Sequence, residues 1–210
     1  MDKTLLSGER YLTDVAFSTD GMFLCAISRK GTGWCWQTDT WDMSRVICQF
    51  SDAARSLTFS PDGIYLAIAC INGALVVWDC HSWTQVINQR FNGEVTVVQF
   101  IPGQPLLALG FEHGEIQLWD YKRSLLLASL IRHRERITDL AAMHDGQVLF
   151  SSGNDQRLVG WDIEQRILLF ELGTENDAPL ALALHPQETI LAAGMASGHI
   201  LWYMVPHQYS

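Results

Sequence analysis

Short runs of alternating apolar and polar residues fill this chain, and turn-forming residues separate them. The clearest stretch is Asp139–Asp162, whose three runs end at His144-Asp145-Gly146, at Gly153-Asn154-Asp155 and at Trp161-Asp162. Alternation with a period of two is typical of a β-strand with one buried face. Glycine beside Asn or Asp favours a tight turn between strands. The stretch therefore predicts three consecutive antiparallel strands.

The same pattern recurs along the whole chain. Trp36, Trp78, Trp119 and Trp161 are 42, 41 and 42 residues apart, and the next step of 42 lands on Tyr203. Five leucines keep this spacing as well: Leu24, Leu66, Leu107, Leu149 and Leu191. A repeat of roughly 40–45 residues that ends in Trp-Asp is the signature of a four-stranded propeller blade. Five such units cover essentially the whole sequence.

The segment Val148–Asp162, VLFSSGNDQRLVGWD, resembles the WD-repeat β-propeller family. The Trp-Asp pair is intact in three units, whereas the first unit has Trp36-Gln37 and the last has Tyr203-Met204. The resemblance implies an all-β fold, a single propeller domain of five four-stranded antiparallel blades over residues 1–210. The blades are expected at about residues 12–50, 55–90, 95–130, 137–171 and 178–204. The first outer strand is expected at Ile47–Phe50.

The last unit ends without a fourth strand, while residues 3–8 match the segment that precedes a later inner strand. By resemblance, residues 3–8 pair with the last blade and close the ring, which hides two open sheet edges. The family usually has seven blades. The alternatives are therefore a part of a larger propeller, or an open ring that a partner completes.

The composition narrows the class of partner. The chain has 210 residues, 48% of them hydrophobic, and a formal net charge of −9. This charge argues against a nucleic acid or an anionic membrane as the main partner, since both attract clustered Lys and Arg. No apolar run reaches the roughly 20 residues of a membrane span, and the start, Met1-Asp2-Lys3-Thr4, lacks the pattern of a signal peptide. We expect a soluble, cytoplasmic protein.

The five cysteines, an odd number, lie mostly within expected strands. They form no CxxC pair of the kind that binds zinc. We expect five reduced, buried thiols, no metal site and no cofactor.

Four polar residues of the fourth unit invite comparison with a catalytic set: His133, Ser151, Asp155 and Trp161. In WD repeats, which this unit resembles, these positions form a structural hydrogen-bond chain inside the blade. Only the fourth unit holds all four residues. We therefore interpret them as a structural tetrad and not as a catalytic site, and expect the fourth blade to be the most rigid.

Asp14 and Asp139 occupy matching positions in the inner strands of two units. Some five-bladed propellers are carbohydrate-active enzymes with acidic residues around the central channel, and glycoside hydrolysis uses a pair of carboxylates. The matching positions elsewhere are Ser56, Val97 and Ala181. We expect no enzymatic activity, and the alternative is a carbohydrate-active propeller enzyme.

The resemblance implies a non-catalytic scaffold that binds protein or peptide partners on the face formed by its loops. The candidate partner-binding residues are Arg10, Lys30, Arg55, Asn72, Phe91, His113, Arg132, Arg134, Gln156 and Ser197. Phe91 is the only large aromatic among them and is the best single anchor. Arg132, Arg134 and Arg136 form the most basic segment, a solvated loop or a local site for an acidic or phosphorylated peptide.

Three further interpretations stay open. The chain can be the sensor or partner-binding module of a larger multidomain protein, or a structural subunit that completes the ring of another chain. Trp41 and Trp83, 42 residues apart, either cap the blade edges or form a contact on the side surface.

Overall fold

The computed structural model describes Leu5, residues 11–187 and residues 189–205. The outer strand expected at residues 3–8 falls, apart from Leu5, outside the described residues. The chain forms two compact units, one up to Val95 and one from Thr96 onward, and each unit is considered by itself.

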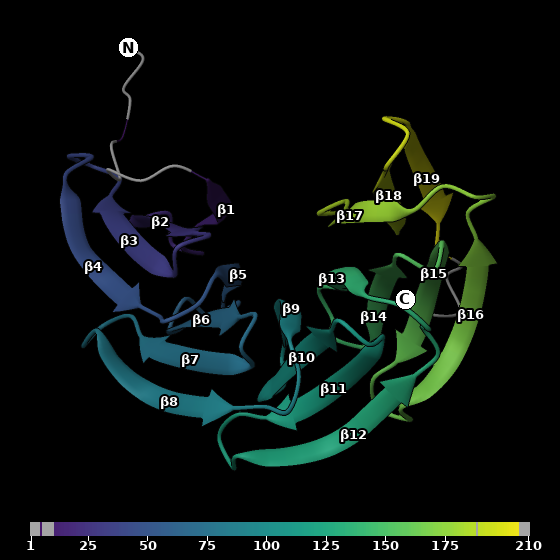
Figure 1. Ribbon diagram of the computed structural model, residues 1–210, viewed down its shortest axis with the longest axis horizontal. Helices are drawn as coiled ribbons and strands as arrows, with labels where there is room; N and C mark the ends of the chain where they lie inside the picture. The colour runs from purple at the N-terminus through teal and green to yellow at the C-terminus, as the bar shows by residue number, and fades with distance from the viewer. Residues whose placement is uncertain (1–4, 6–10, 188, 206–210) are drawn as a thin grey trace. The chain divides into compact units, whose positions relative to one another are not determined.

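The described residues form nineteen strands in five antiparallel sheets, and within each sheet the strands lie side by side in chain order (Figure 1). The sheets are called blades 1–5 below. The strands of the first unit are β1 (Leu12–Phe17), β2 (Phe23–Ser28), β3 (Thr32–Gln37), β4 (Met43–Gln49), β5 (Ala54–Phe59), β6 (Tyr65–Cys70), β7 (Ala74–Asp79) and β8 (Thr84–Arg90).

The second unit holds the remaining strands, except that β9 begins at the last residue of the first unit. They are β9 (Val95–Ile101), β10 (Leu106–Phe111), β11 (Glu115–Asp120), β12 (Leu125–Ile131), β13 (Ile137–Ala142), β14 (Val148–Gly153), β15 (Arg157–Asp162), β16 (Ile167–Gly173), β17 (Pro179–Leu184), β18 (Ile190–Met195) and β19 (Ile200–Met204). Blades 1–4 have four strands each, and blade 5 has three in the described part of the chain.

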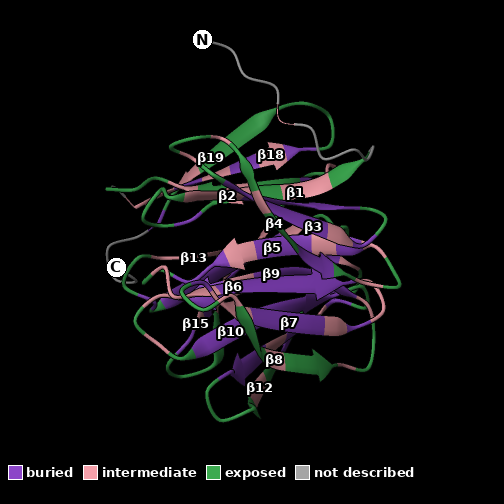
Figure 2. Cartoon of the chain, turned by 90° about the vertical axis from the view of Figure 1, so that its left-hand side faces the viewer, coloured by how far each residue is buried: buried purple, intermediate pink, exposed green. Residues whose placement is uncertain are grey.

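In blades 1–4 the two middle strands are mostly buried on both faces, whereas the fourth strands are more open to solvent. In blade 5, β18 is fully buried only at alternate positions. All six residues of β10, LLALGF, are buried, and six of the seven residues of β8, TQVINQR, are exposed. Figure 2 shows the same contrast between β7 and β8. A strand that is covered on both sides needs apolar residues at every position, because both sets of alternating side chains meet other sheets.

Each unit has its own hydrophobic core between neighbouring blades. In the first unit the core includes Ile27, Leu57 and Leu66. In the second unit one cluster joins blades 3 and 4 and another joins blades 4 and 5, around Leu149 and Phe150 respectively. Within each unit, neighbouring sheets are thus stacked face to face through apolar side chains, whose burial is the dominant favourable contribution to folding.

Three threonines at the same position of the inner strand connect neighbouring blades. The hydroxyl groups of Thr13, Thr96 and Thr138 donate to the backbone carbonyl 41 residues further on, at 2.7, 2.7 and 2.6 Å. Each bond joins one inner strand to the inner strand of the next blade within the same unit.

Two expectations from the sequence need correction. Strand β4 begins at Met43 and not at Ile47, and a disulfide joins Cys25 to Cys35 across β2 and β3. These two cysteines face each other directly in the strand register. The other three cysteines are free and buried, and burial raises the pKa of each thiol to about 12.

Candidate functional site

In blades 1, 2 and 4, one end of the blade carries two kinds of loop that lie against each other. The hairpin between the second and third strands meets the loop that leaves the fourth strand: Phe50 N–H donates to Gly31 at 2.9 Å, and Phe91 N–H donates to Gly73 at 2.8 Å. At Gly73, which has φ of 81°, a Cβ atom would lie 2.3 Å from the carbonyl oxygen of Phe91. Only glycine fits such an approach. The surface formed by these loops is called the loop face of each blade.

The structure describes nine of the ten candidate partner-binding residues, since Arg10 lies outside the described residues. Six have exposed side chains, namely Lys30, His113, Arg132, Arg134, Gln156 and Ser197, and three are half-buried, namely Arg55, Asn72 and Phe91. Several are engaged locally. Asn72 donates to Asp52, the ring of His113 contacts Glu115 at 3.0 Å, and Ser197 donates to Asp177.

Acidic residues neutralise most of the basic segment before β13. Arg132 pairs with Glu171, and Arg136 lies 3.4 Å from Glu112. Within the described part of the chain, the exposed guanidinium of Arg134 has no ion pair, although its backbone N–H donates to Asp155 at 3.0 Å. The segment therefore presents one uncompensated cation and not three.

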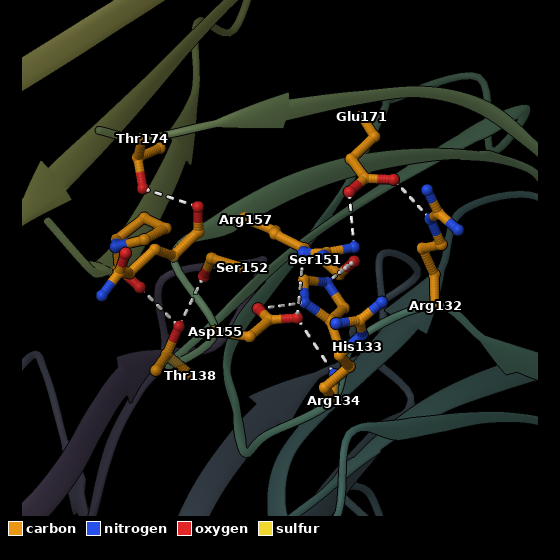
Figure 3. Close-up of polar contacts among 12 residues, drawn as sticks. Arg132, His133, Arg134, Thr138, Ser151, Ser152, Asp155, Arg157, Glu171 and Thr174 are labelled. Atoms are coloured by element: carbon orange, nitrogen blue, oxygen red, sulfur yellow. Dashed lines mark hydrogen bonds and ion pairs between the residues drawn. The ribbon is translucent and has the colours of Figure 1, made fainter. Parts of the chain in front are cut away.

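The structure brings together His133, Ser151, Asp155 and Trp161 in one hydrogen-bond chain. Figure 3 shows the first three of these side chains. The imidazole of His133 contacts Asp155 through Nδ1 and Ser151 through Nε2, both at 2.8 Å. The indole N–H of Trp161 donates to the same Ser151 hydroxyl at 2.8 Å. His133 and Ser151 are buried, so the serine hydroxyl faces other side chains and not solvent.

The chain of bonds continues beyond these four residues. Arg157 lies 3.6 Å from Asp155 and 2.6 Å from Glu171, which also pairs with Arg132 (Figure 3). The buried tetrad is thus tied to an ion-pair network that reaches the surface. Apolar side chains in place of Asp155 or Ser151 would leave the buried donors of His133 and Trp161 without acceptors.

Blade 2 shows what happens without the serine. Trp78 is the counterpart of Trp161, and Ile68 takes the place of Ser151. Among the described residues, the buried indole N–H of Trp78 has no hydrogen-bond partner.

The carboxylates of Asp14 and Asp139 connect inner strands. Asp14 accepts the N–H groups of Val15 and Leu57, both at 2.8 Å. Asp139 does the same with Leu140 at 2.8 Å and Leu182 at 2.6 Å. Burial raises the pKa of Asp14, and the two backbone donors partly offset this effect. Both oxygens of each carboxylate are occupied by backbone groups, an arrangement that fixes neighbouring blades.

Trp41 and Trp83 occupy matching turns with positive φ angles of 61° and 52°. The ring of Trp83 packs edge-on against Phe23 at 5.2 Å, and the guanidinium of Arg45 lies 4.6 Å above it. Trp83 is half-buried and belongs to the core of the first unit. Its contacts are with blade 1, so it packs one blade against another.

Two features were missed by the sequence reasoning. The interblade threonines lie in the repeat register, and that spacing was their available signal. The pairing of Arg157 with Glu171 follows from strand register, in which Val159 lies opposite Glu171. Among the described residues, no group of three His, Cys, Asp or Glu side chains is arranged to hold a metal ion. The described residues also contain no helix with the length and apolar character that crossing a bilayer requires.

A family model described as "WD domain, G-beta repeat" matches residues 44–79 and 124–162. The crystal structure of the Cps50 (Swd1) β-propeller domain from Myceliophteria thermophila superposes with a TM-score of 0.85 at 20% identity, covering 96% of this chain and 68% of that one. The chain belongs to the WD-repeat family. A chain in the crystal structure of the Mitotic Checkpoint Complex gives a TM-score of 0.81 at 24% identity, covering 93% of this WD-repeat chain and 61% of that one.

Curated relatives of this WD-repeat chain are longer than the part that it matches. APC/C activator protein CDC20 of Saccharomyces cerevisiae is 26% identical over 80% of this chain and 28% of its own length. Target of rapamycin complex subunit wat1 of Schizosaccharomyces pombe is 26% identical over 82% of this chain and 56% of its own. Telomerase Cajal body protein 1 of Homo sapiens is 31% identical over 70% of this chain and 29% of its own.

Proposed function

We propose that this WD-repeat chain is a non-catalytic scaffold that binds peptide or protein partners with its loop face. The main support is the way the loops are held. The hairpins of blades 1, 2, 4 and 5 are bonded through the backbone to a neighbouring loop, so exposed residues such as Lys30 and Arg134 project from a fixed frame. A frame that is ordered before binding lowers the entropy lost on association.

The polar groups that resemble catalytic sets support the same proposal. The Ser151 hydroxyl is buried between His133 and Trp161, and both oxygens of Asp14 and Asp139 accept backbone N–H groups. A nucleophile or general base has to reach substrate atoms within hydrogen-bond distance. These groups serve blade architecture instead.

The relatives' names support a partner that is a protein. One relative is named as an activator of APC/C, another as a subunit of the target of rapamycin complex, and one structural neighbour lies in a Mitotic Checkpoint Complex. We extend to this chain only the general role of holding proteins together.

A partner-capture experiment tests the proposal. Wild-type protein and the loop-face double variant Phe91→Ala/Arg134→Ala are used as baits, and captured proteins are quantified by mass spectrometry. The matched control is Arg123→Ala, which removes an exposed arginine from the turn at the opposite end of its blade. The proposal requires that specific partners are lost with the loop-face variant and retained with the control. Equal capture by all three baits would refute it.

A second candidate function follows from the share of its relatives' lengths that this chain spans. Since the chain spans 28% to 56% of the first relatives' lengths, the same blades can serve as the partner-binding module of a larger protein. Detection of the native protein with an antibody against residues 1–210 tests this, because a mass near 23.6 kDa would contradict it.

A further inference from the structure

Blade 5 contains a cavity at the place where blade 4 holds its buried histidine. In the repeat register, 42 residues after His133, Ser151, Asp155 and Trp161, stand Glu175, Ala193, Ser197 and Tyr203. In blade 4 a Cβ at Gly153 would lie 2.6 Å from the His133 ring, so the imidazole fills this space. In blade 5 the counterpart Glu175 is exposed, and a cavity of about 450 Å³ lies between blades 4 and 5.

The walls of this cavity provide acceptors for a cation. Its polar lining includes Glu175, Asp177 and His199, while Leu201 and the Tyr203 ring supply apolar surface. Asp177 already accepts from the N–H and the hydroxyl of Ser197, so Glu175 is the main acceptor for a cation. Within the described residues, no lysine or arginine pairs with Glu175. Burial raises the pKa of Tyr203, so its hydroxyl stays protonated at neutral pH. A carboxylate beside apolar and aromatic walls suits a basic side chain, whose stem packs on the walls while its charge meets the acid.

The strand that lines this cavity also has one edge without a partner strand among the described residues. β19 pairs with β18 on one side, and in the described part of the chain no fourth strand covers its other side. Each of the other four blades has such a strand. An unpaired edge presents a row of backbone donors and acceptors, which extended peptides use for strand addition.

Blade 4 shows where a side chain of an added strand would point. On its fourth strand, Glu171 lies opposite Val159 and reaches Arg132 and Arg157 (Figure 3). In blade 5, Leu201 is the counterpart of Val159, Thr174 that of Arg132 and His199 that of Arg157. All three counterparts line the cavity.

The charge arrangement is reversed between the two blades. Blade 4 has an acid on its fourth strand and two arginines in the wall, whereas blade 5 has Glu175 and Asp177 in the wall. A residue opposite Leu201 on an added strand would therefore enter an acidic cavity.

We propose that an extended partner peptide adds to β19 as a fourth strand and places a lysine or arginine side chain in this cavity. The inference rests on the proposed scaffold function and names the chemistry of one partner. The chain's own residues 3–8, which include Lys3, are the competing occupant and form one outcome of the test.

The test uses fluorescein-labelled probes built on the outer strand of blade 2, Thr84–Arg90, in which Asn88 lies opposite Val76 at the equivalent position. One peptide carries Asn88→Lys and the other Asn88→Glu, and fluorescence anisotropy measures binding to the 210-residue protein. A third peptide combines Asn88→Lys with Ile87→Pro, which removes a backbone donor and disrupts strand pairing.

The lysine peptide should bind roughly tenfold more tightly than the glutamate peptide, a difference of about 1.4 kcal/mol. The proline peptide should not bind. In the protein, Glu175→Gln should reduce the lysine preference to roughly threefold or less, because one ion pair is lost. The matched variant Glu164→Gln, at an exposed turn of blade 4, should leave it unchanged.

Equal binding of the lysine and glutamate peptides would overturn the proposal. The proposal would also be overturned if the lysine peptide did not bind. That result would mean either that residues 3–8 occupy the edge of β19 or that the cavity does not accept a cation. If these probes fail while the loop-face variant still loses its captured partners, this inference is wrong and the scaffold function stands.

Discussion

Replacing Ser151 with alanine tests the tetrad most sharply. The Ser151 hydroxyl is the shared partner of His133 Nε2 and Trp161 Nε1, each at 2.8 Å. The substitution removes one oxygen atom and little volume. Its cost therefore comes from the two groups that lose their partner, and not from a cavity.

The magnitude follows from burial. The side chain of His133 has 0% exposure and Trp161 has 3%, so water does not replace the lost bonds. A buried donor or acceptor left unsatisfied costs about 1–3 kcal/mol. Two such groups predict a loss of about 2–6 kcal/mol in the free energy of unfolding of blade 4.

Native-state hydrogen exchange measures this loss locally, through the opening free energies of amides in β13–β16. The matched control is Ser152→Ala, since Ser152 is equally buried. Its hydroxyl bonds Thr138 at 2.8 Å and, at 3.5 Å, the carbonyl of Asp139, and Thr138 has a second partner in Pro179. The control should cost about 1 kcal/mol. A loss below about 1 kcal/mol for Ser151→Ala, or one equal to that of the control, would refute the reasoning.

Three further results are expected. Trp161→Phe should lower stability by about 1–3 kcal/mol more than Trp78→Phe, because only the Trp161 indole N–H has an acceptor; equal urea midpoints would contradict this. Thr138→Val, which keeps the side-chain shape but removes the donor to the next blade, should cost about 1–2 kcal/mol in urea unfolding, and an unchanged midpoint would show that the bond is dispensable. A maleimide at pH 8 should label none of the three buried thiols in the folded protein, since each has a pKa of about 12. Unfolding should expose three thiols, and reduction should add two more from the Cys25–Cys35 disulfide. Five reactive thiols in the unfolded protein without reduction would exclude this disulfide.

The repeat spacing predicts most strand positions because tight turns mark the strand ends. Pro61-Asp62-Gly63 and Asn72-Gly73 stand directly beside β5, β6 and β7. The beginning of β4 was misplaced because Met43 and Arg45 are exposed, so the first residues of that outer strand show no buried alternating face.

Contacts that depend on register were harder to predict. Cys25 and Cys35 are ten residues apart, and only the exact pairing of β2 with β3 places them opposite each other. The arginines of the basic segment look uncompensated in the sequence. Arg132 meets an acid 39 residues further along the chain, and this partner becomes evident only when the blades are stacked.

Docking of partners on the loop face can be mapped by hydrogen exchange in a complex with a captured partner. Exchange should slow on binding in loops such as residues 29–31, 71–73, 91–94 and 132–136, with the turns at the opposite end of each blade unchanged. Protection confined to those opposite turns, such as residues 61–63 and 121–124, or to the exposed outer strands would contradict docking on the loop face.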